Sequence, residues 1–399
     1  MRQRLASSTL LAILLIASCL QCEALQLARR AHARITHLND LNKPDELSGA
    51  RLLEAARAGG DYLIRMQRSD GSFHYYYDAR LDHFESRRYN VVRHAGTAAS
   101  LLELYQATGD ARYLESAKRA VYFLSKRFRR ARSRDGLYVL DYDGKAKLGA
   151  NGLALLALAK LIKLDPRSTD RQTAARLANL ILALQRRNGS FEARYRLASG
   201  SAAGPESLYY PGEAILGLLS LFSLNGDRRL LEAARRGADF LIESQKRMTA
   251  LPADAWLMQA LEALYVIGRE KTYVDHAIAL AKAMMASQYT DEAPHGYSGG
   301  FGPGPPRATP AASRAEGLAA AYRIARSTGD VRAAMIAASL KACARFQLAQ
   351  QFTGANSALL PNPPRAAGGF RESAASFGIR IDFVQHNISS LLAIAEALY

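Results

Sequence analysis

Residues 149–164 read GANGLALLALAKLIKL, and the organisation of the whole chain can be worked out from them. Apolar side chains surround this stretch on every side at helical spacing, so the helix that it predicts has to be packed on all faces. A turn at Leu164-Asp165-Pro166 follows, and then an Arg-rich amphipathic stretch that ends near Gln185. An apolar helix followed by an amphipathic one predicts a hairpin with one inner and one outer helix.

The same hairpin recurs along the chain. Its short turns are centred on Gly109, Asp165, Gly226, Gly268 and Gly329, which are 56, 61, 42 and 61 residues apart. A glutamine near the end of the outer helix repeats with a similar spacing, and these glutamines are Gln67, Gln185, Gln245, Gln288 and Gln347. Two independent markers with one spacing indicate a repeated structural unit.

Two alternating sets of helices follow from this repeat. The amphipathic, Arg-rich set is expected at 49–67, 111–127, 170–186, 228–246, 271–288 and 331–350. The nearly apolar set is expected at 91–107, 149–164, 211–225, 253–267, 313–328 and 382–398. Because a helix without a polar face must be buried, the second set predicts an inner layer and the first an outer layer around it.

The connections between helices are as unequal as the helices. Inner-to-outer turns are short, whereas all outer-to-inner connections except the one between 246 and 253 are long. Four of the long loops carry a Gly-Ser-Phe or Gly-Gly-Phe sequence, which starts at Gly71, Gly189, Gly299 and Gly368. Antiparallel hairpins place all the long loops at one end, and loops of this length in a compact domain are usually functional.

Six helical hairpins with this Gln and Gly-Ser-Phe punctuation resemble the (α/α)6 toroid, or barrel. That architecture is shared by many glycoside hydrolases, polysaccharide lyases, uronyl C5-epimerases and terpenoid cyclases. The resemblance covers residues 47–399 and implies an all-α fold, closed into a ring, with a single catalytic domain. It is specific for the architecture and not for one chemistry, because unrelated reactions use this fold.

The N-terminal 24 residues have the features of an export signal. Arg2 and Arg4 precede an apolar run, Leu10–Ala17, that is too short to span a bilayer, and cleavage is expected after Ala24. A second interpretation is a bacterial lipobox that ends at Cys19, which would leave a lipid anchor on that residue. Residues 25–46 are expected to be a linker, and the protein is expected in the periplasm or outside the cell.

Composition and charge limit the class of partner. The 399 residues are 49% hydrophobic and 22% charged, which excludes a disordered chain and a polytopic membrane protein. A formal net charge of +17 favours an anionic partner, and with an export signal an acidic polysaccharide is favoured over nucleic acid. An Arg-rich solvated surface explains the same charge equally well. Only Cys343 lies beyond the signal, so we expect no disulfide in the mature chain.

Polar residues at the starts of the inner helices are the candidates for chemistry, because these starts converge on the loop-rich end. Glycoside hydrolysis needs two carboxyl groups across a cleft. Glu213, Asp254 and Asp382, together with His94, are therefore expected to be catalytic. Asp254 and Asp382 also stand where a helix cap is expected, and Ser313 with Glu316 has the spacing of a capping box.

Lyase or epimerase chemistry would use a different set, in which Arg or Asn neutralises a carboxylate and Tyr or His moves a proton. The residues expected to bind the substrate are Arg93, Asn151, Tyr209, Tyr210, Arg314, Glu316, Arg380, Gln385 and His386. For His94 and His386, the alternative is a histidine satisfied within the core. A glycan-binding toroid without turnover remains a third interpretation.

Aromatic side chains on the long loops are candidate sugar-stacking groups. They are Tyr75, Tyr77 and Trp256, and the alternation around Tyr75 equally suits a short hairpin strand. No cofactor is expected, and no metal either, because the sequence has neither an HExxH motif nor a compact set of ligands. The sequence thus predicts an exported carbohydrate-active enzyme, a glycoside hydrolase first and a lyase or C5-epimerase second.

Overall fold

The computed structural model describes residues 47–399 except for 86–88, 133–134, 168–170, 196–201 and 204–206. By its internal contacts, the chain divides into one unit up to Arg51 and a second unit that runs from Leu52 to Tyr399. The expected export signal, the lipobox cysteine Cys19 and the linker 25–46 lie outside the described residues.

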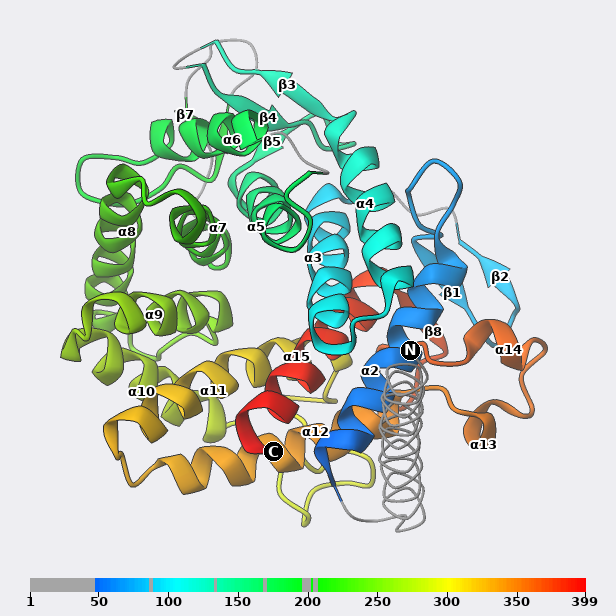
Figure 1. The fold of residues 1–399 in the computed structure, drawn as a ribbon. Helices are drawn as coiled ribbons and strands as arrows, with labels where there is room; N and C mark the ends of the chain where they lie inside the picture. The colour runs from blue at the N-terminus through cyan, green and yellow to red at the C-terminus, as the bar shows by residue number, and fades with distance from the viewer. Residues whose placement is uncertain (1–46, 86–88, 133–134, 168–170, 196–201, 204–206) are drawn as a thin grey trace, which may run out of the picture. The chain divides into compact units, whose positions relative to one another are not determined.

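Six inner helices form a closed ring. Each contacts the next one along the chain, and the last returns to the first (Figure 1). The inner helices are α3 (Val91–Thr108), α5 (Leu148–Leu164), α7 (Tyr210–Asn225), α9 (Ala255–Gly268), α11 (Ala308–Thr328) and α15 (Ile381–Leu398). The contact between α15 and α3 closes the ring, which the repeat alone could not establish.

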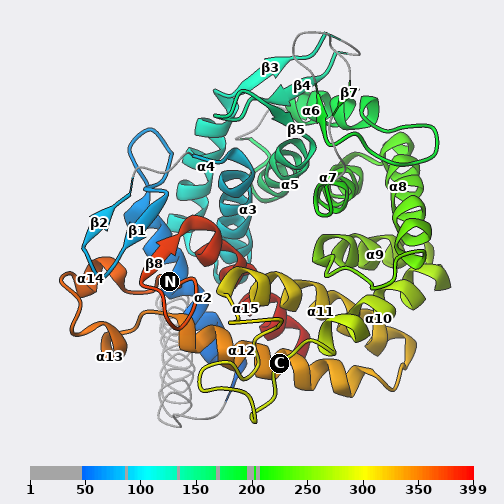
Figure 2. The ribbon, with the colours of Figure 1, turned by 180° about the vertical axis from the view of Figure 1, so that it is seen from behind.

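Six outer helices surround this ring, and the view from behind shows the same two layers (Figure 2). They are α2 (Gly49–Met66), α4 (Ala111–Ser125), α6 (Arg171–Ala183), α8 (Arg228–Lys246), α10 (Lys271–Met285) and α12 (Ala333–Gln350). Two short helices, α13 (Gly354–Ser357) and α14 (Pro363–Ala366), lie in the last long loop. The fold is the (α/α)6 barrel that the sequence predicts.

Close backbone contact between inner helices explains their glycines. A Cβ atom at Gly217 of α7 would lie 2.6 Å from the carbonyl oxygen of Gly152 on α5. At Gly212, a Cβ would lie 2.7 Å from the backbone nitrogen of Leu257 on α9. Since a Cβ cannot fit at these distances, the glycines determine how closely the inner helices approach one another.

Among the described residues, no helix is both long enough and apolar enough to cross a membrane.

The short turns at the far end repeat one local structure. Gly109, Gly226 and Gly329 end α3, α7 and α11 in the left-handed conformation, with φ of 69°, 67° and 67°. The aspartate that follows each glycine accepts a hydrogen bond from the backbone of an arginine two residues later and pairs with its side chain. These are three of the five short turns that mark the repeat in the sequence.

The glutamine marker joins neighbouring outer helices. The Gln67 amide donates to the carbonyl of Gly71 in its own loop and to that of Ser116 on α4. Gln185 and Gln288 make the equivalent pairs of bonds, to Gly189 and Ala233 and to Gly299 and Ser339. Gln351 bonds to Gly368 and to Ala55 of α2, so the last outer helix is joined to the first.

Two of the predicted glutamine markers have other roles. Gln347 is buried on α12 and donates to the sulfur of Cys343, and the repeat position is Gln351, four residues later. Our assignment of Gln347 was therefore wrong by one helical turn. Gln245 bonds to Asp254 and His276 instead of to a loop glycine, because the connection after α8 is short and has no Gly-x-Phe.

The loop-rich end is held by short strands. Strand β1 (Tyr76–Asp78) pairs with β2 (His83–Phe84) and with β8 (Gly378–Arg380), and Tyr76 stands opposite Arg380. Strand β3 (Phe128–Arg130) pairs with β4 (Leu137–Val139). A third small sheet has the order β5 (Ala146–Lys147), β6 (Arg194–Tyr195) and β7 (Ala202–Ala203). The β1–β8 pair joins the first long loop to the last and places Arg380 at the start of α15.

Candidate active site

A cavity of about 430 Å³ lies at the N-terminal ends of the inner helices. That volume suits one or two sugar rings, which is within the range of small-molecule sites. Many of the residues predicted from the sequence line it together, namely Arg93, Tyr209, Tyr210, Glu213, Trp256, Arg314, Arg380, Asp382, Gln385 and His386. The central expectation, that these helix starts converge on one site, is thus met in the geometry.

His386 is the histidine of this cavity. Its Nδ1 lies 2.8 Å from Oε1 of Glu316, which comes from the neighbouring helix α11. A carboxylate accepts, so Nδ1 carries the hydrogen and Nε2 is the nitrogen left for a ligand. Within the described residues no hydrogen bond is formed at Nε2. A histidine that is oriented by a carboxylate and lines a cavity is suited to general acid–base chemistry.

The electrostatics of this pair favour a bound proton. Burial lowers the pKa of His386, but the charge of Glu316, the hydrogen bond to Glu316 and the charge of Asp382 offset burial and leave that pKa raised. Burial also raises the pKa of Glu316, and the interaction with His386 offsets this rise only in part. Because the two groups titrate together, the pair as a unit binds its proton more tightly than an isolated histidine does.

Glu213 supplies a second titratable group to the same cavity. It is 5% exposed, and its Oε2 is buried without a hydrogen-bond partner in the described structure. Burial raises its pKa to about 8, with His386 opposing and Asp254 adding to the shift. The carboxyl is therefore protonated at neutral pH, which fits a proton donor. Gly149 of α5 makes room for it, since a Cβ there would lie 2.1 Å from Oε2.

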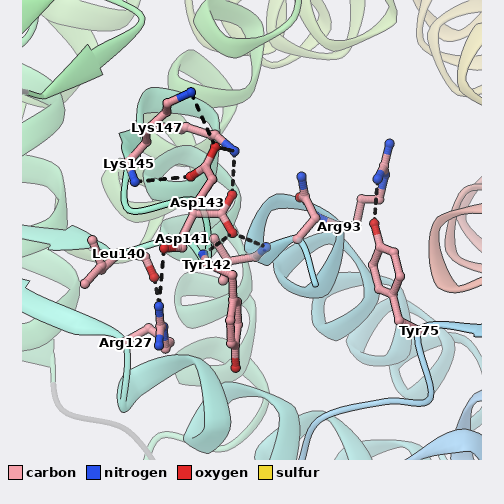
Figure 3. A network of polar contacts seen from close by, with 11 residues as sticks. Tyr75, Arg93, Arg127, Leu140, Asp141, Tyr142, Asp143, Lys145 and Lys147 are labelled. Carbon is pink, nitrogen blue, oxygen red and sulfur yellow. Dashed lines mark hydrogen bonds and ion pairs between the residues drawn. The ribbon is translucent and has the colours of Figure 1, made fainter. Parts of the chain in front are cut away.

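Asp382 is held between two arginines. Arg380 donates to both of its carboxylate oxygens, and Nε of Arg93 lies 3.2 Å from Oδ2. Arg93 also donates to the hydroxyl of Tyr75, a contact that Figure 3 shows. Asp382 does not cap α15, because that helix begins at Ile381 and Arg380 occupies the cap position. Its carboxylate instead fixes two guanidinium groups at the cavity wall.

Two of the expected residues, Asp254 and Glu316, are not part of the wall of this cavity. Asp254 is fully buried and caps α9 by accepting from Leu257, and Gln245 donates to its other oxygen. Burial raises the pKa of Asp254 to about 7. Its side chain is not part of the cavity wall, so it acts on the site through Glu213. Glu316 is not in a capping box, because α11 begins at Ala308, five residues before Ser313.

His94, Asn151 and Tyr77 were expected at the mouth, and the structure buries all three elsewhere. Nε2 of His94 bonds to the carbonyl of Ala120 and Nδ1 to the hydroxyl of Tyr89, and burial lowers the pKa of this histidine to about 4. Asn151 bridges the backbone of Val139 and Leu137.

The aromatic residues of the first loop are also less available than expected. Tyr77 is buried in β1 and donates to Asp82, and Tyr75 is 6% exposed with its hydroxyl bound to Arg93. The hairpin-strand interpretation of this stretch is therefore the correct one. Trp256 and the exposed Tyr209 remain as aromatic cavity walls, and the Trp256 ring lies 6.1 Å from that of His386, edge to face.

A charged network beside the site was missed by sequence reasoning. Buried Asp141 accepts from the backbone of Val91, the first residue of α3, and its Oδ2 lies 2.6 Å from Nζ of Lys147 (Figure 3). Lys147 also pairs with Asp143 at 2.9 Å. The network holds the loop before α5 against the start of α3. Its sequence signal is a charged residue at every second position of this loop, namely Asp141, Asp143, Lys145 and Lys147.

A smaller polar cavity of about 130 Å³ lies deeper in the ring and shares Trp256 and Gln385 with the first. Glu316 lines it, as do Glu103 and Lys160, which form an ion pair at 3.1 Å. Glu316 therefore has polar space on the side away from His386. In the part of the chain that the structure describes, no group of three His, Cys, Asp or Glu side chains could hold a metal ion.

Comparisons with known proteins agree with this architecture. No protein-family profile and no curated protein matches the sequence. Among solved structures, a D-mannose isomerase is similar over 87% of this chain and 97% of its own, with 12% identity and a TM-score of 0.65. Cellobiose 2-epimerase from Bacillus thermoamylovorans B4167 is similar over 86% and 98%, with 11% identity and a TM-score of 0.64.

An α-1,6-mannanase of Salegentibacter sp. HEL1_6, an inactive variant in complex with α-1,6-mannotriose, is similar over 87% of this chain and 99% of its own. Its identity is 13% and its TM-score is 0.62. At such low identities these likenesses establish a common fold. The chemistry of this chain has to be argued from its own cavity.

Proposed function

We propose that this protein is a carbohydrate-active enzyme that moves a proton at the carbon next to a sugar carbonyl, as a sugar isomerase or epimerase does. The observation that carries the proposal is the His386–Glu316 pair, whose Nε2 is left for a ligand in a cavity of about 430 Å³. Sugar isomerases and epimerases also share this fold, as the mannose isomerase and the cellobiose epimerase do.

The two titratable groups suit the two halves of such a reaction. Neutral His386 takes the proton from C2 of the open-chain sugar, and the electron pair left behind forms the C1–C2 double bond of an enediol. Protonated Glu213 gives its proton to the carbonyl oxygen in the same step. Return of the carbon-bound proton to C1, while the C2 hydroxyl gives its proton to the Glu213 carboxylate, forms a carbonyl at C2 and gives the isomer. If the enediol first turns its other face toward His386, return of the proton to C2, while the C1 hydroxyl gives its proton to Glu213, re-forms the C1 carbonyl and gives the epimer.

Glycoside hydrolysis is the second candidate. It is favoured by the protonated Glu213 carboxyl, which fits a general acid, and by Asp382 in the same cavity as a second carboxylate. Against it, both oxygens of Asp382 are engaged by arginine side chains. The inactive mannanase variant replaces two consecutive aspartates, and this sequence has no two consecutive aspartates. Proton transfer is therefore the first choice.

Incubation with unlabelled sugars in D₂O tests the proposal. Mannose, glucose, cellobiose and mannuronate would each be followed by proton NMR for exchange of the C2 hydrogen and for new isomers. An epimerase introduces solvent deuterium at C2. An isomerase introduces it at C1 of the ketose and, on reversal, at C2 of the aldose. The His386→Asn variant should do neither. New reducing ends from mannotriose without deuterium at C2 would instead establish hydrolysis. A new ultraviolet absorbance from uronate polymers would establish a lyase, because elimination forms a conjugated double bond.

The pH profile separates the two candidates independently. A histidine base requires its neutral form, so activity should rise with pH through a value above the ordinary 6.5 of histidine. It should fall again near pH 8, where Glu213 loses its proton. A hydrolase does not require neutral His386, so the rising limb of its pH profile would not follow the titration of that histidine.

The proposal also includes where the protein acts. We propose export through the N-terminal signal, in the periplasm or outside the cell, with Cys19 as a candidate lipid anchor. The cavity volume suits a free sugar or the end of a polysaccharide chain rather than its middle. If sugars bind with no turnover and no deuterium exchange, the glycan-binding interpretation replaces the enzymatic one.

A further inference from the structure

The cavity wall carries more positive than negative charge. Two guanidinium groups, those of Arg93 and Arg380, share the one carboxylate of Asp382. Glu213 is protonated at neutral pH and so contributes no charge to offset them. The pair of His386 and Glu316 is neutral as a unit as long as it holds one proton. A substrate that enters therefore meets an uncompensated positive field.

Arg314 adds to this surplus and has no counter-ion. Among the described residues no carboxylate lies within ion-pair distance of its guanidinium. Its Nη1 donates to the carbonyl of Pro310 at 3.1 Å, and the guanidinium lies 5.5 Å from the centre of the Phe301 ring. Its Nε is buried without a partner, and burial lowers the pKa of this arginine. A partly buried cation without a partner is costly unless an anion binds to it.

The surroundings of Arg314 complete a small polar corner. Thr309 lines the same cavity, and its hydroxyl is buried without a hydrogen-bond partner in the described structure. Tyr209 is close enough to raise the pKa of Arg314 against the effect of burial. A planar guanidinium held at a fixed angle by Pro310 and Phe301 suits bidentate recognition of a carboxylate, sulfate or phosphate group.

We propose that Arg314 binds the anionic group of a charged sugar, so that the substrate is a sugar acid, sugar sulfate or sugar phosphate rather than a neutral sugar. This rests on the proposed function only in taking the ligand to be a sugar. Arg314 precedes Glu316 by two residues on α11, so the same helix positions the anion-binding group and the partner of His386. It is a binding residue and takes no part in the proton transfer.

The single tryptophan of the chain gives a direct test. Trp256 lines the cavity, so its fluorescence reports binding there without any need for turnover. The ligands would be mannose, mannuronate, mannose 6-phosphate and inorganic phosphate, at constant ionic strength. We expect the charged sugars to bind the wild type about tenfold or more tightly than mannose, as charge-assisted hydrogen bonds allow. Inorganic phosphate alone should bind weakly, since it lacks the sugar contacts.

Substitutions of two arginines on the same helix make a matched pair. Arg314→Gln should remove the preference for charged sugars to within about twofold, by loss of the charge-assisted hydrogen bonds. Arg326→Gln removes the same charge near the end of α11, away from the cavity, and should leave the preference unchanged. Arg314→Lys keeps the charge but lacks the planar guanidinium, so it should retain part of the preference for charged sugars. It tests the same inference if the glutamine variant does not fold.

Several results would overturn the inference. One is that the wild type binds charged and neutral sugars equally, or binds no sugar. Another is that the preference for charged sugars survives in Arg314→Gln. A third is that inorganic phosphate binds as tightly as the sugar phosphate. The last result would indicate a site for free anions. The same titration in His386→Asn separates this inference from the proposed function. If the preference persists in that variant, and the wild type exchanges no C2 hydrogen in any of the sugars, the anion site is retained and the isomerase is rejected.

Discussion

Two histidines on adjacent inner helices, His94 on α3 and His386 on α15, have opposite environments. Both lie near the start of an apolar helix, but His94 is fully buried, whereas 13% of the His386 side chain is exposed. His94 uses both ring nitrogens within the core, on Ala120 and Tyr89, whereas His386 uses one nitrogen on Glu316 and leaves the other for a ligand. Burial lowers the pKa of His94 to about 4, but the pKa of His386 is raised.

The difference teaches that burial alone does not decide what a histidine does. In both sites burial disfavours the charged ring, and near His386 the carboxylates of Glu316 and Asp382 outweigh the effect of burial. Near His94 the bond to Ala120 and the distant charge of Asp70 only reduce the effect of burial. One histidine is therefore a neutral packing group and the other a group that can change its protonation state near neutral pH.

The largest expected effect comes from exchanging the two histidines for amides. His386→Asn keeps a donor to Glu316 and removes Nε2, so turnover should fall by about 10³-fold while the fold persists. His94→Gln keeps a donor to Ala120 and should lower thermal stability while kcat changes by less than about threefold. Circular dichroism melts and deuterium exchange at sugar C2 measure the two effects. Reversed outcomes for the two variants would exchange their assigned roles.

The ring could be predicted from the sequence because each helix carries its own signal. All-round apolar helices such as 149–164, and the turn glycines, identify inner helices and their ends without knowledge of their neighbours. The start of α11 was placed five residues late. Pro310 and the Gly/Pro-rich stretch before it are typical of a loop, yet proline is tolerated in a first helical turn.

The site could be predicted only as a set of positions. Residues at the inner-helix starts were found, but their roles depend on partners from distant parts of the chain. His386 is 70 residues from Glu316, and His94 is 26 residues from Ala120, so nothing in the local sequence distinguishes the two histidines. The same limit applies to Gln351, whose role is defined by a carbonyl on α2, 296 residues away.

The second effect is on stability as a function of pH. The pKa of His94 is about 4 when folded and near 6.5 when unfolded, so between these values the unfolded chain binds more protons. Stability should therefore fall as pH falls from 6.5 to 4, and His94 should contribute about 3 kcal/mol to that loss.

Urea unfolding of the wild type and His94→Gln between pH 7 and pH 4 measures this contribution. His276, whose pKa is also lowered to about 4, is present in both proteins and cancels in the difference. The variant should be less stable at pH 7 but less sensitive to acid. Parallel stability curves would mean that His94 is not held neutral by burial.

A third, smaller effect is expected at the partner of His386. Glu316→Gln keeps a hydrogen-bond acceptor for Nδ1 and removes the charge, so the pKa of His386 should fall and kcat should drop about 10- to 100-fold. The rising limb of the pH profile should move to lower pH by the same amount as the pKa of His386 in NMR. Glu262→Gln, which removes a carboxylate that pairs with Arg323 and lines neither cavity, is the control and should move neither. A limb that stays in place in Glu316→Gln would remove Glu316 as the positioning residue.

The smallest expected effect concerns the partner of His94. The Tyr89 hydroxyl donates to Nδ1 of His94 and accepts from the backbone of Phe73, so Tyr89→Phe leaves a buried acceptor and a buried donor unpaired. The loss should be about 1–3 kcal/mol, because unpaired buried polar groups carry their full desolvation cost. His386 makes no contact with Tyr89, so the pH profile of turnover should stay unchanged. Thermal melts and that profile, measured on the same preparation, check both statements. A shifted profile would show that the two histidine sites are coupled across the α3–α15 contact and are not separate as argued here.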